Sequence, residues 1–537
     1  MKYNSCFKKL EEDNEMLFTI SPLFIYKSCI LYLVLPILFF FIEWLRIGIG
    51  ILLSSLLLLS SYFFIKKIKE LIAEDAEIVL SKEYFFTFII LFLFLLSTGN
   101  TGFIGSWGVD IPWRNAIYQD LIRYSWPVIY DYSHSMLCYY MMFWLVPAKI
   151  TALLGLNEVG SNVILFIWMY IGLLLVFFLL CNILRVDRNY VIYIAILFLF
   201  FSGINTIGML IKSVFIHPDP LIGDVPGRLG WSFADYDIKG VRSVYIIRSV
   251  FLCIADVYNQ FFAVAISTFL YLRFKTSIGC FAFIGLLALP YSPIGFIGLL
   301  IVILFQYLVV LFSKKTELLL MYFRSFFSLT NILSILAIVP VFYLYFSMNV
   351  HASSLLTKTG SSNVGFLYVA LDQYNIFRVA MLIVYYISYF GLYTYLLFPY
   401  YKKSSLYWSV IFCLLIFPFF KIGGGEDFNY NATICPFLIL FTLIAKIIIN
   451  MLKFQQVNIR GIVLISLLSI AMLTPIIQIS TAFRAAYLYD VPCYKWNAWD
   501  IILKQDSFAD KNINGFSNFL SNAYDKSLFF RYCAKKT

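Results

Sequence analysis

The feature that most constrains this chain is a series of apolar runs, each close to the length that crosses a bilayer. A helix rises about 1.5 Å per residue and the hydrocarbon core is about 30 Å thick, so one crossing needs about 20 residues. Runs of this kind occupy residues 23–43, 46–65, 84–100, 161–182, 189–209, 249–272, 277–290, 293–312, 329–347, 376–398, 405–420, 431–449 and 459–479. The sequence therefore predicts an all-α polytopic membrane protein with about 13 transmembrane helices.

Composition supports the same fold class. Hydrophobic residues make up 62% of the 537 residues and charged residues 13%, against about 25% charged residues in a soluble domain. The net charge of +11 is distributed in small groups, so we interpret it as a topology signal and expect no nucleic-acid partner. Most of the ten cysteines lie in apolar runs, which excludes a disulfide framework as the basis of the fold.

Short basic segments predict the orientation. All of them fall on one side of the membrane if the predicted spans are correct, and that side is cytoplasmic by the positive-inside rule. They contain Lys8, Lys9, Lys66, Lys67, Lys69, Arg185, Arg188, Arg273, Lys275, Lys314, Lys315, Lys402, Lys403, Lys453 and Arg460. The N-terminus is then inside and the tail 480–537 outside, in a bacterial cytoplasmic membrane. This orientation requires residues 134–155 to form a helix in the outer interface, with Tyr, Trp and Met facing lipid.

The predicted spans divide the chain into four parts. Residues 1–83 are a cytoplasmic segment with an extra hairpin, and 84–312 are a module with outer segments at 101–160 and 210–248. Residues 313–479 are further spans, and 480–537 are the outer tail. The pair of runs at 277–312 is also consistent with one kinked or re-entrant unit around Pro290 and Pro293.

Charged side chains beside aromatic ones mark the first outer segment. Its candidate site residues are Asp110, Arg114, Asp120, Arg123 and His134. Arg forks match phosphate oxygens and aromatic faces stack on sugars, so the pattern favours a sugar-phosphate site. An interfacial loop with aromatic anchors and solvated charges explains the same pattern.

The second outer segment carries a further set of charged residues. Its candidates are His217, Asp219, Arg228, Arg242 and Arg248, together with Asp224, Asp235 and Asp237. Four aspartates could hold a divalent cation such as Mg²⁺ or Mn²⁺ through oxygen ligands. A solvated loop without metal is the alternative.

Two more polar groups lie at predicted membrane segments. Asp256, Asn259 and Gln260 share one face of the sixth span if that helix is regular. An acid within a span should face a polar cavity or a polar partner. It could have a functional role, or could form a structural hydrogen bond between helices. After three glycines, Glu426, Asp427, Asn429 and Asn431 could line the mouth of the same cavity, or could cap the twelfth span.

The layout of residues 84–210 resembles the N-terminal module of GT-C glycosyltransferases, which use polyprenyl-phosphate-linked sugars. The resemblance is carried by the span 84–100, the early outer acid Asp110, and the aromatic segment YSHSMLCYYMMFWLVPAKITALLG before the next span. This chain departs from the family in having a single acid at that place and an extra N-terminal hairpin.

The resemblance implies an enzyme that transfers a sugar from the polyprenyl-phosphate donor to a glycan or lipid acceptor, with inversion. It implies that Asp110 is the catalytic base or binds the acceptor. Asp219 is expected as a secondary acid, and Arg228, Arg242 and Arg248 as phosphate ligands, because cations stabilise a departing phosphate.

Two other functions remain open from the sequence. A lipid or polysaccharide transporter would use Asp256 for ion coupling and the Pro290/Pro293 break as a discontinuous helix. An O-antigen-type polymerase or ligase would share the substrates, but its polar residues would be concentrated in one outer segment. A disulfide between Cys493 and Cys533 is a further possibility in the outer tail.

Overall fold

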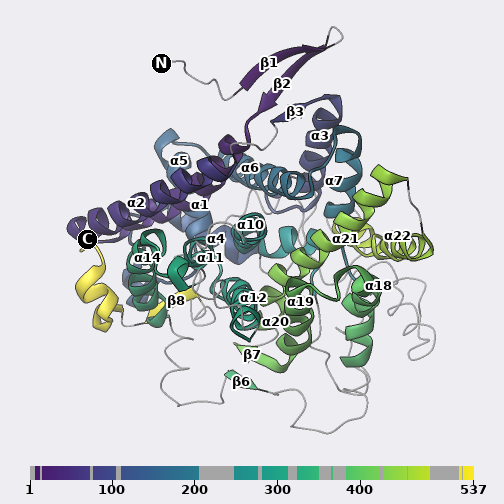
Figure 1. Cartoon of the computed structure of the whole chain (residues 1–537). Helices are drawn as coiled ribbons and strands as arrows, with labels where there is room; N and C mark the ends of the chain where they lie inside the picture. Colours follow the sequence, from purple (N-terminus) through teal and green to yellow (C-terminus); the bar gives the residue numbers. More distant parts are fainter. Residues whose placement is uncertain are drawn as a thin grey trace, which may run out of the picture.

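A computed structural model describes most of the chain. The described residues are 7–12, 15–72, 77–103, 111–204, 247–275, 281–312, 323–349, 364–366, 382–422, 427–455, 458–483, 519–522 and 524–536. They are dominated by helices, with three small sheets at the periphery (Figure 1). The predicted fold class, an all-α polytopic membrane protein, is confirmed.

Within the described residues, nine helical segments are long and apolar enough to cross a membrane. They are Pro22–Trp44 (α1), Ile47–Leu71 (α2), Glu158–Leu184 (α6), Val250–Phe274 (α10), Pro293–Phe312 (α12), Leu329–Ser347 (α14), Leu382–Tyr401, Phe428–Phe454 and Ile459–Ser480. The last three include α18 (Leu392–Tyr401), α21 (Ile434–Phe454), and α22 (Ile459–Ala471) with most of α23 (Leu473–Phe483). Each of the nine coincides with a predicted span.

The other four predicted spans correspond to shorter helices. These are Lys82–Ser97 (α3), Val191–Leu199 (α7), Phe281–Ala288 (α11) and Ser405–Ile416 (α19). The total of 13 stays a prediction. Residues 289–292 form the turn between α11 and α12, so the proline-flanked pair of runs is divided into a short helix and a long one.

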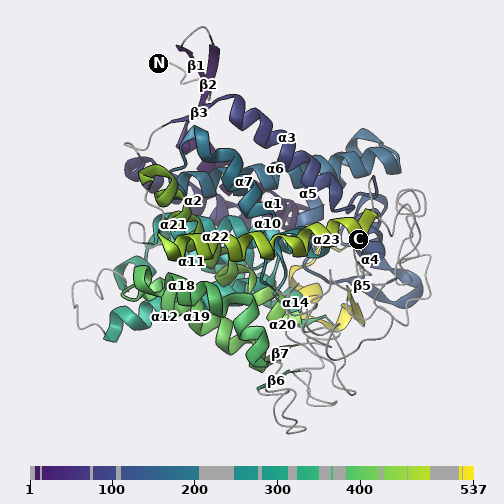
Figure 2. The same cartoon turned by 90° about the vertical axis from the view of Figure 1, so that its right-hand side faces the viewer.

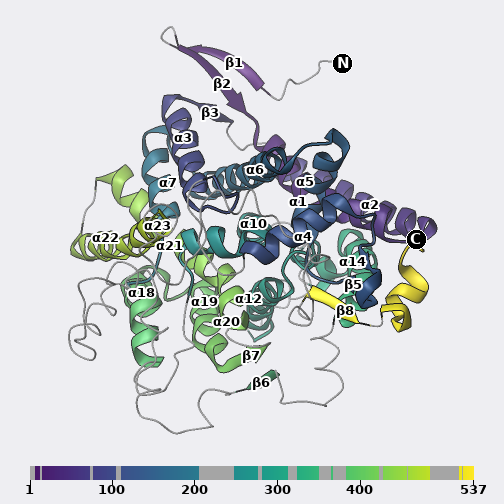
Figure 3. The same ribbon diagram turned by 180° about the vertical axis from the view of Figure 1, so that it is seen from behind.

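The helix α10 lies at the centre of the bundle. Its apolar window is 89% buried, whereas the windows of α2 and α12 are 33% and 28% buried. The three views show α10 surrounded by other helices (Figures 1, 2 and 3), and it contacts α5, α6, α11, α12, α21 and α23. Polar side chains on α10 are therefore held inside the protein.

The small sheets join segments that were predicted to lie on the same side of the membrane. On the predicted inner side, β1 (Phe7–Glu12), β2 (Glu15–Ile20) and β3 (Ile78–Leu80) form one antiparallel sheet. On the predicted outer side, β4 (Ile129–Tyr130), β5 (Ser135–Leu137) and β8 (Leu520–Asn522) form a second, and β6 (Val364–Phe366) pairs with β7 (Phe420–Ile422). Sheet β1–β2–β3 and the pair β6–β7 lie at opposite ends of the molecule (Figures 1 and 3).

The C-terminal segment docks on the predicted outer ends of α1 and α14. Phe529 is fully buried, and its ring lies 6.3 Å from that of Phe40 and 5.3 Å from that of Tyr345. The Arg46 amide donates a hydrogen bond of 2.8 Å to the carbonyl of Cys533. Cys493 lies outside the described residues, so the predicted disulfide with Cys533 stays a prediction.

The predicted interface helix needs correction. The helix α5 is Met142–Leu154, and the residues before it form β5 and a turn instead of helix. Met142 and Trp144 are fully buried and do not face lipid, because the Trp144 indole donates to the Tyr258 hydroxyl of α10 at 3.0 Å. The exposed side chains of α5 include aliphatic ones, with Leu153 75% exposed. Aromatic residues with polar groups pack inward here because α10 offers them hydrogen-bond partners.

The packing of α2 against α1 gives a stability prediction. A Cβ at Gly50 would lie 2.2 Å from the carbonyl oxygen of Phe41, whereas one at Gly48 would have no heavy atom within 4 Å. We expect Gly50→Ala to lower stability by about 1–3 kcal/mol, because rigid backbone must move to relieve the clash. Gly48→Ala is the matched control and should unfold like the wild type. Thermal unfolding in detergent checks both, and equal midpoints for all three proteins would contradict this packing.

Candidate functional site: an arginine–aspartate–arginine cluster

The candidate site is built around the first turns of α10. Ser249 caps this helix by accepting a hydrogen bond of 3.1 Å from the amide of Leu252. Arg248 precedes the cap, and its guanidinium folds back along the helix, with Nη2 2.7 Å from Oδ2 of Asp256. Their side chains are 12% and 20% exposed, so this ion pair is largely withdrawn from water.

A second arginine reaches the same carboxylate from the first outer segment. Residues 111–123, which were predicted as part of a loop, form the helix α4 (Ile111–Arg123). Apolar positions along it are buried, including Ile111, Ile117 and Leu121. Its Arg114 side chain is only 6% exposed, and Nη1 lies 3.8 Å from Oδ1 of Asp256. One carboxylate therefore lies between two guanidinium groups of different elements.

The position of Arg114 depends on anchors further along α4. The hydroxyl of Tyr118 donates to the carbonyl of Ser161 at 2.8 Å. Burial raises the pKa of the Tyr118 phenol, so the group stays a neutral donor. Asp120 is fully buried and accepts a hydrogen bond of 2.6 Å from the Tyr130 hydroxyl. Asp120 thus fixes α4 to β4.

The third side of the site comes from the start of the predicted twelfth span. Helix α20 (Asp427–Ala432) carries Asn431, whose Oδ1 accepts a hydrogen bond of 3.2 Å from Nη1 of Arg248. The Arg248 guanidinium also lies over the Tyr430 ring, 4.5 Å from its centroid. This stacking is a favourable cation–π contact. Arg248 is therefore held by two neighbours besides Asp256.

The helix α10 is irregular directly after Asp256. Val257 has non-helical dihedral angles, φ −133° and ψ 38°. On one side of this break, Nδ2 of Asn100 donates 2.7 Å to the carbonyl of Ile254. On the other, Gln260 accepts 2.7 Å from the Ser292 hydroxyl. The break is stabilised by side chains from other segments.

The break corrects the expectation that Asp256, Asn259 and Gln260 share one face of a regular helix. Asp256 turns to the arginines, while Gln260 contacts Ser292 and, at 3.4 Å, the Tyr140 hydroxyl. Asn259 is fully buried, and neither atom of its side-chain amide has a hydrogen-bond partner among the described residues.

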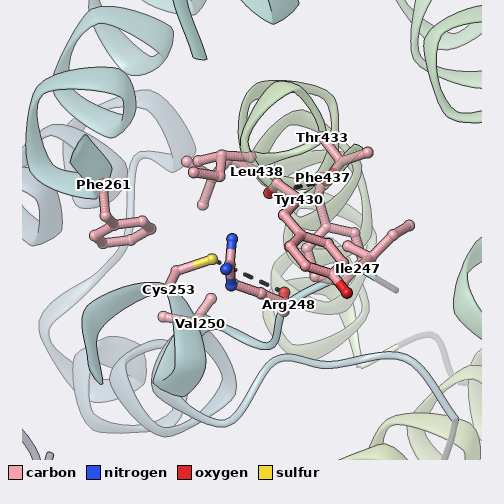
Figure 4. Close-up of a pocket in the computed structure, with 10 residues that line it drawn as sticks. Ile247, Arg248, Val250, Cys253, Phe261, Tyr430, Thr433, Phe437 and Leu438 are labelled. Atoms are coloured by element: carbon pink, nitrogen blue, oxygen red, sulfur yellow. Dashed lines mark hydrogen bonds between the residues drawn. The ribbon is translucent and has the colours of Figure 1, made fainter. Parts of the chain in front are cut away.

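A small cavity adjoins Arg248. Figure 4 shows the guanidinium pointing into it, among the side chains of Cys253, Phe261, Tyr430 and Leu438. Its volume is about 10 Å³, which is room for about one water molecule. The remaining wall is apolar apart from Thr433. This cavity, lined by described residues, is too small for a lipid chain.

Two other candidates from the first outer segment lie away from this cluster. Arg123 forms an exposed ion pair of 3.3 Å with Glu158 at the start of α6. His134 is exposed and adopts a left-handed backbone conformation, with φ 46°, in the turn before β5. Both have local partners or solvent around them, and neither is brought to Asp256.

Several candidates cannot be placed. Asp110, His217, Asp219, Arg228 and Arg242 lie outside the described residues, as do Asp224, Asp235 and Asp237 of the suggested cation site. Asp427 is the first residue of α20. In the described part of the chain, no group of three or more His, Cys, Asp or Glu side chains could hold a metal ion.

Sequence reasoning identified Arg114, Arg248, Asp256 and Asn431 as polar candidates but missed their neighbours. Neither Tyr430 nor Asn100 stands out in the sequence as a site residue. Tyr430 is one of 39 tyrosines, and Asn100 lies at the end of an apolar run. Their roles arise from contacts between segments that are distant in sequence.

Comparisons with known proteins identify no relative. No family model, curated protein sequence or solved structure matches this chain. The likeness to GT-C glycosyltransferases therefore rests on the layout of residues 84–210 and stays a prediction.

Proposed function

We propose that this protein is a membrane glycosyltransferase that transfers a sugar from a polyprenyl-phosphate donor to a glycan or lipid acceptor at the outer membrane face. The observation that carries the proposal is the cluster of Arg114, Asp256 and Arg248. The elements that build it converge at their predicted outer ends. Paired guanidinium groups in a low-dielectric setting are suited to a phosphate.

The chemistry needs a base as well as a phosphate site. The bond between the anomeric carbon and the phosphate oxygen breaks, and the phosphate leaves with the electron pair. The acceptor oxygen forms the new bond, and its proton passes to a carboxylate. We propose Asp110 as this base, because it immediately precedes α4, the helix that carries Arg114. Base and phosphate ligand would then be held by one element.

The two arginines would stabilise charge that develops on the departing phosphate. Such preorganised cations are worth several kcal/mol because they need no reorganisation during the reaction. Arg248 is preorganised by Asn431 and Tyr430, and Arg114 by the anchors of α4. A divalent cation held by the second outer segment would add to this charge, and Asp219 would serve as the secondary acid.

Mass spectrometry of lipid-linked sugars tests the proposal. Purified protein in lipid nanodiscs is incubated with lipid-linked sugars extracted from membranes of the producing organism and with the glycan fraction. We expect loss of a sugar-phosphate lipid, gain of the free polyprenyl phosphate, and an acceptor heavier by one sugar. Unchanged masses of donor and acceptor would overturn an enzymatic function.

One observation favours a second candidate, a lipid or polysaccharide transporter. The central helix α10 is broken at Val257, next to the partly exposed Asp256, and discontinuous helices of this kind occur at transporter binding sites. A transporter moves its lipid substrate without changing its mass. Fluorescent lipid translocation in sealed vesicles, with unchanged masses, would favour this candidate over the transferase.

A further inference from the structure

Among the described residues, the two arginines of the cluster already share an anionic partner. Asp256 contacts both guanidinium groups, at 2.7 Å from Arg248 and 3.8 Å from Arg114. The adjoining cavity of about 10 Å³ has room for about one water molecule, so a phosphate group does not fit without movement. Any anion that binds the two arginines has to displace the group that already bridges them.

The carboxylate is the part of the cluster that is easiest to displace. The Asp256 side chain is 20% exposed, against 6% for Arg114 and 12% for Arg248. It is also the last residue before the non-helical Val257, where the regular hydrogen-bonded helix is interrupted. The carboxylate is therefore the most exposed of the three side chains and is attached at the least regular point of the helix.

The arginine side chain would keep its position after the carboxylate leaves. Arg248 retains its hydrogen bond to Asn431 and its stacking on Tyr430. Release of Asp256 opens the side of both arginines that the carboxylate now contacts.

We propose that Asp256 is a placeholder: its carboxylate occupies the two-arginine site until the phosphate group of a substrate displaces it. The inference rests on the proposed function only in taking a phosphate as the ligand of this cluster. It assigns Asp256 a role opposite to that of a substrate ligand, since the side chain competes with the substrate.

A placeholder lowers the apparent affinity of the site for phosphate. The apparent dissociation constant is the intrinsic one divided by the fraction of time for which the placeholder is away from the site. If the site is free of Asp256 for about one tenth of the time, the dissociation constant is raised about 10-fold. Removing the carboxylate removes this competition. A residue that bound the substrate would have the opposite effect when removed.

Phosphate binding to the purified full-length protein in detergent tests the placeholder. The probes are inorganic phosphate and farnesyl monophosphate, and titration calorimetry gives the dissociation constants for wild type and Asp256→Asn. We expect Asp256→Asn to bind about 10-fold more tightly than wild type. If the dissociation constants of both probes fall in Asp256→Asn, the phosphate group is what competes with Asp256. If only that of farnesyl monophosphate falls, the competing ligand is a lipid phosphate. Unchanged or weaker binding of both probes overturns the proposal.

Two controls separate the possible failures. Asp187→Asn removes the same charge from an ion pair with Lys453 on the predicted inner side and should leave affinity unchanged. Arg248→Ala should weaken the binding of both probes. If wild type and Arg248→Ala bind phosphate equally, the phosphate site of the proposed function fails. If Arg248→Ala weakens phosphate binding but Asp256→Asn does not strengthen it, only the placeholder role of Asp256 is rejected.

Infrared difference spectra of the wild type give a second readout that does not depend on the folding of a variant. Displacement of Asp256 from two arginines changes the environment of one carboxylate. We expect saturating phosphate to shift a carboxylate stretching band in wild type. Phosphate binding without any change in the carboxylate bands would overturn the placeholder.

Discussion

Asp110→Asn is expected to abolish sugar transfer while leaving the protein folded. A general base contributes about 10²–10⁴-fold to the rate, and asparagine cannot accept the acceptor's proton. The substitution keeps size and polarity, so helix α4 and the position of Arg114 should be preserved. The measurement is the turnover number for transfer with purified protein, combined with the thermal unfolding midpoint.

Asp131→Asn is the matched control for this loss. Asp131 is an exposed acid of the same outer segment, in the turn after β4. It should keep wild-type turnover. Full activity in Asp110→Asn would exclude this residue as the base and with it the mechanism derived from the family resemblance.

Arg248→Ala is expected to lower kcat/KM for transfer by about 10²–10³-fold. The loss has the size found when one preorganised charge-stabilising group is removed from a transition state. It should appear mainly in kcat if Arg248 acts on the departing phosphate, and mainly in KM if it only holds the donor. Steady-state kinetics at several donor concentrations separate the two contributions.

A conservative variant and a distant one accompany this measurement. Arg248→Lys keeps the charge but loses the planar fork, and should recover only part of the activity. Arg273→Ala removes the same charge from the other, predicted inner, end of α10 and should be as active as wild type. Equal losses in Arg248→Ala and Arg273→Ala would mean that the arginine stabilises α10 without acting on the substrate.

The membrane helices were predictable from the sequence because the bilayer imposes one simple length requirement. The run 329–347 coincides with α14, whose start is marked by Ser328, a capping residue that accepts from Asn331. Strand pairing joins segments that the basic residues assign to the same side of the membrane, and the assignment of sides stays a prediction. One example is the tail strand β8, which pairs with β5 of the first outer segment.

Packing inside the bundle was less predictable. Trp144 was expected to face lipid, but it is buried because Tyr258 of α10 accepts its N–H. The sequence identifies Trp144 as an amphipathic side chain. It does not reveal on which side of the helix a hydrogen-bond partner lies. The break at Val257 is similarly invisible, since it depends on Asn100, which is 154 positions before Ile254.

The candidate site was predictable as a set of residue types and not as a geometry. A buried acid in the sixth span requires a partner, and Arg248 was a candidate from the start of that span. The pairing of Asp256 with Arg114 depends on helix α4, which sequence analysis interpreted as part of a loop. Tertiary contacts between segments far apart in the chain decide such pairings.

The central claim is that the two arginines bind the phosphate of a membrane lipid at the predicted outer end of α10. Photo-crosslinking with a polyprenyl phosphate that carries a diazirine beside the phosphate tests it most directly, with the corresponding phosphate-free alcohol as control. The account predicts adducts on peptides that cover residues 247–261 and 430–438, formed by the phosphate and not by the alcohol, and lost in Arg248→Ala. Adducts confined to lipid-facing helices such as α2 and α12, or equal labelling by the alcohol, would contradict it.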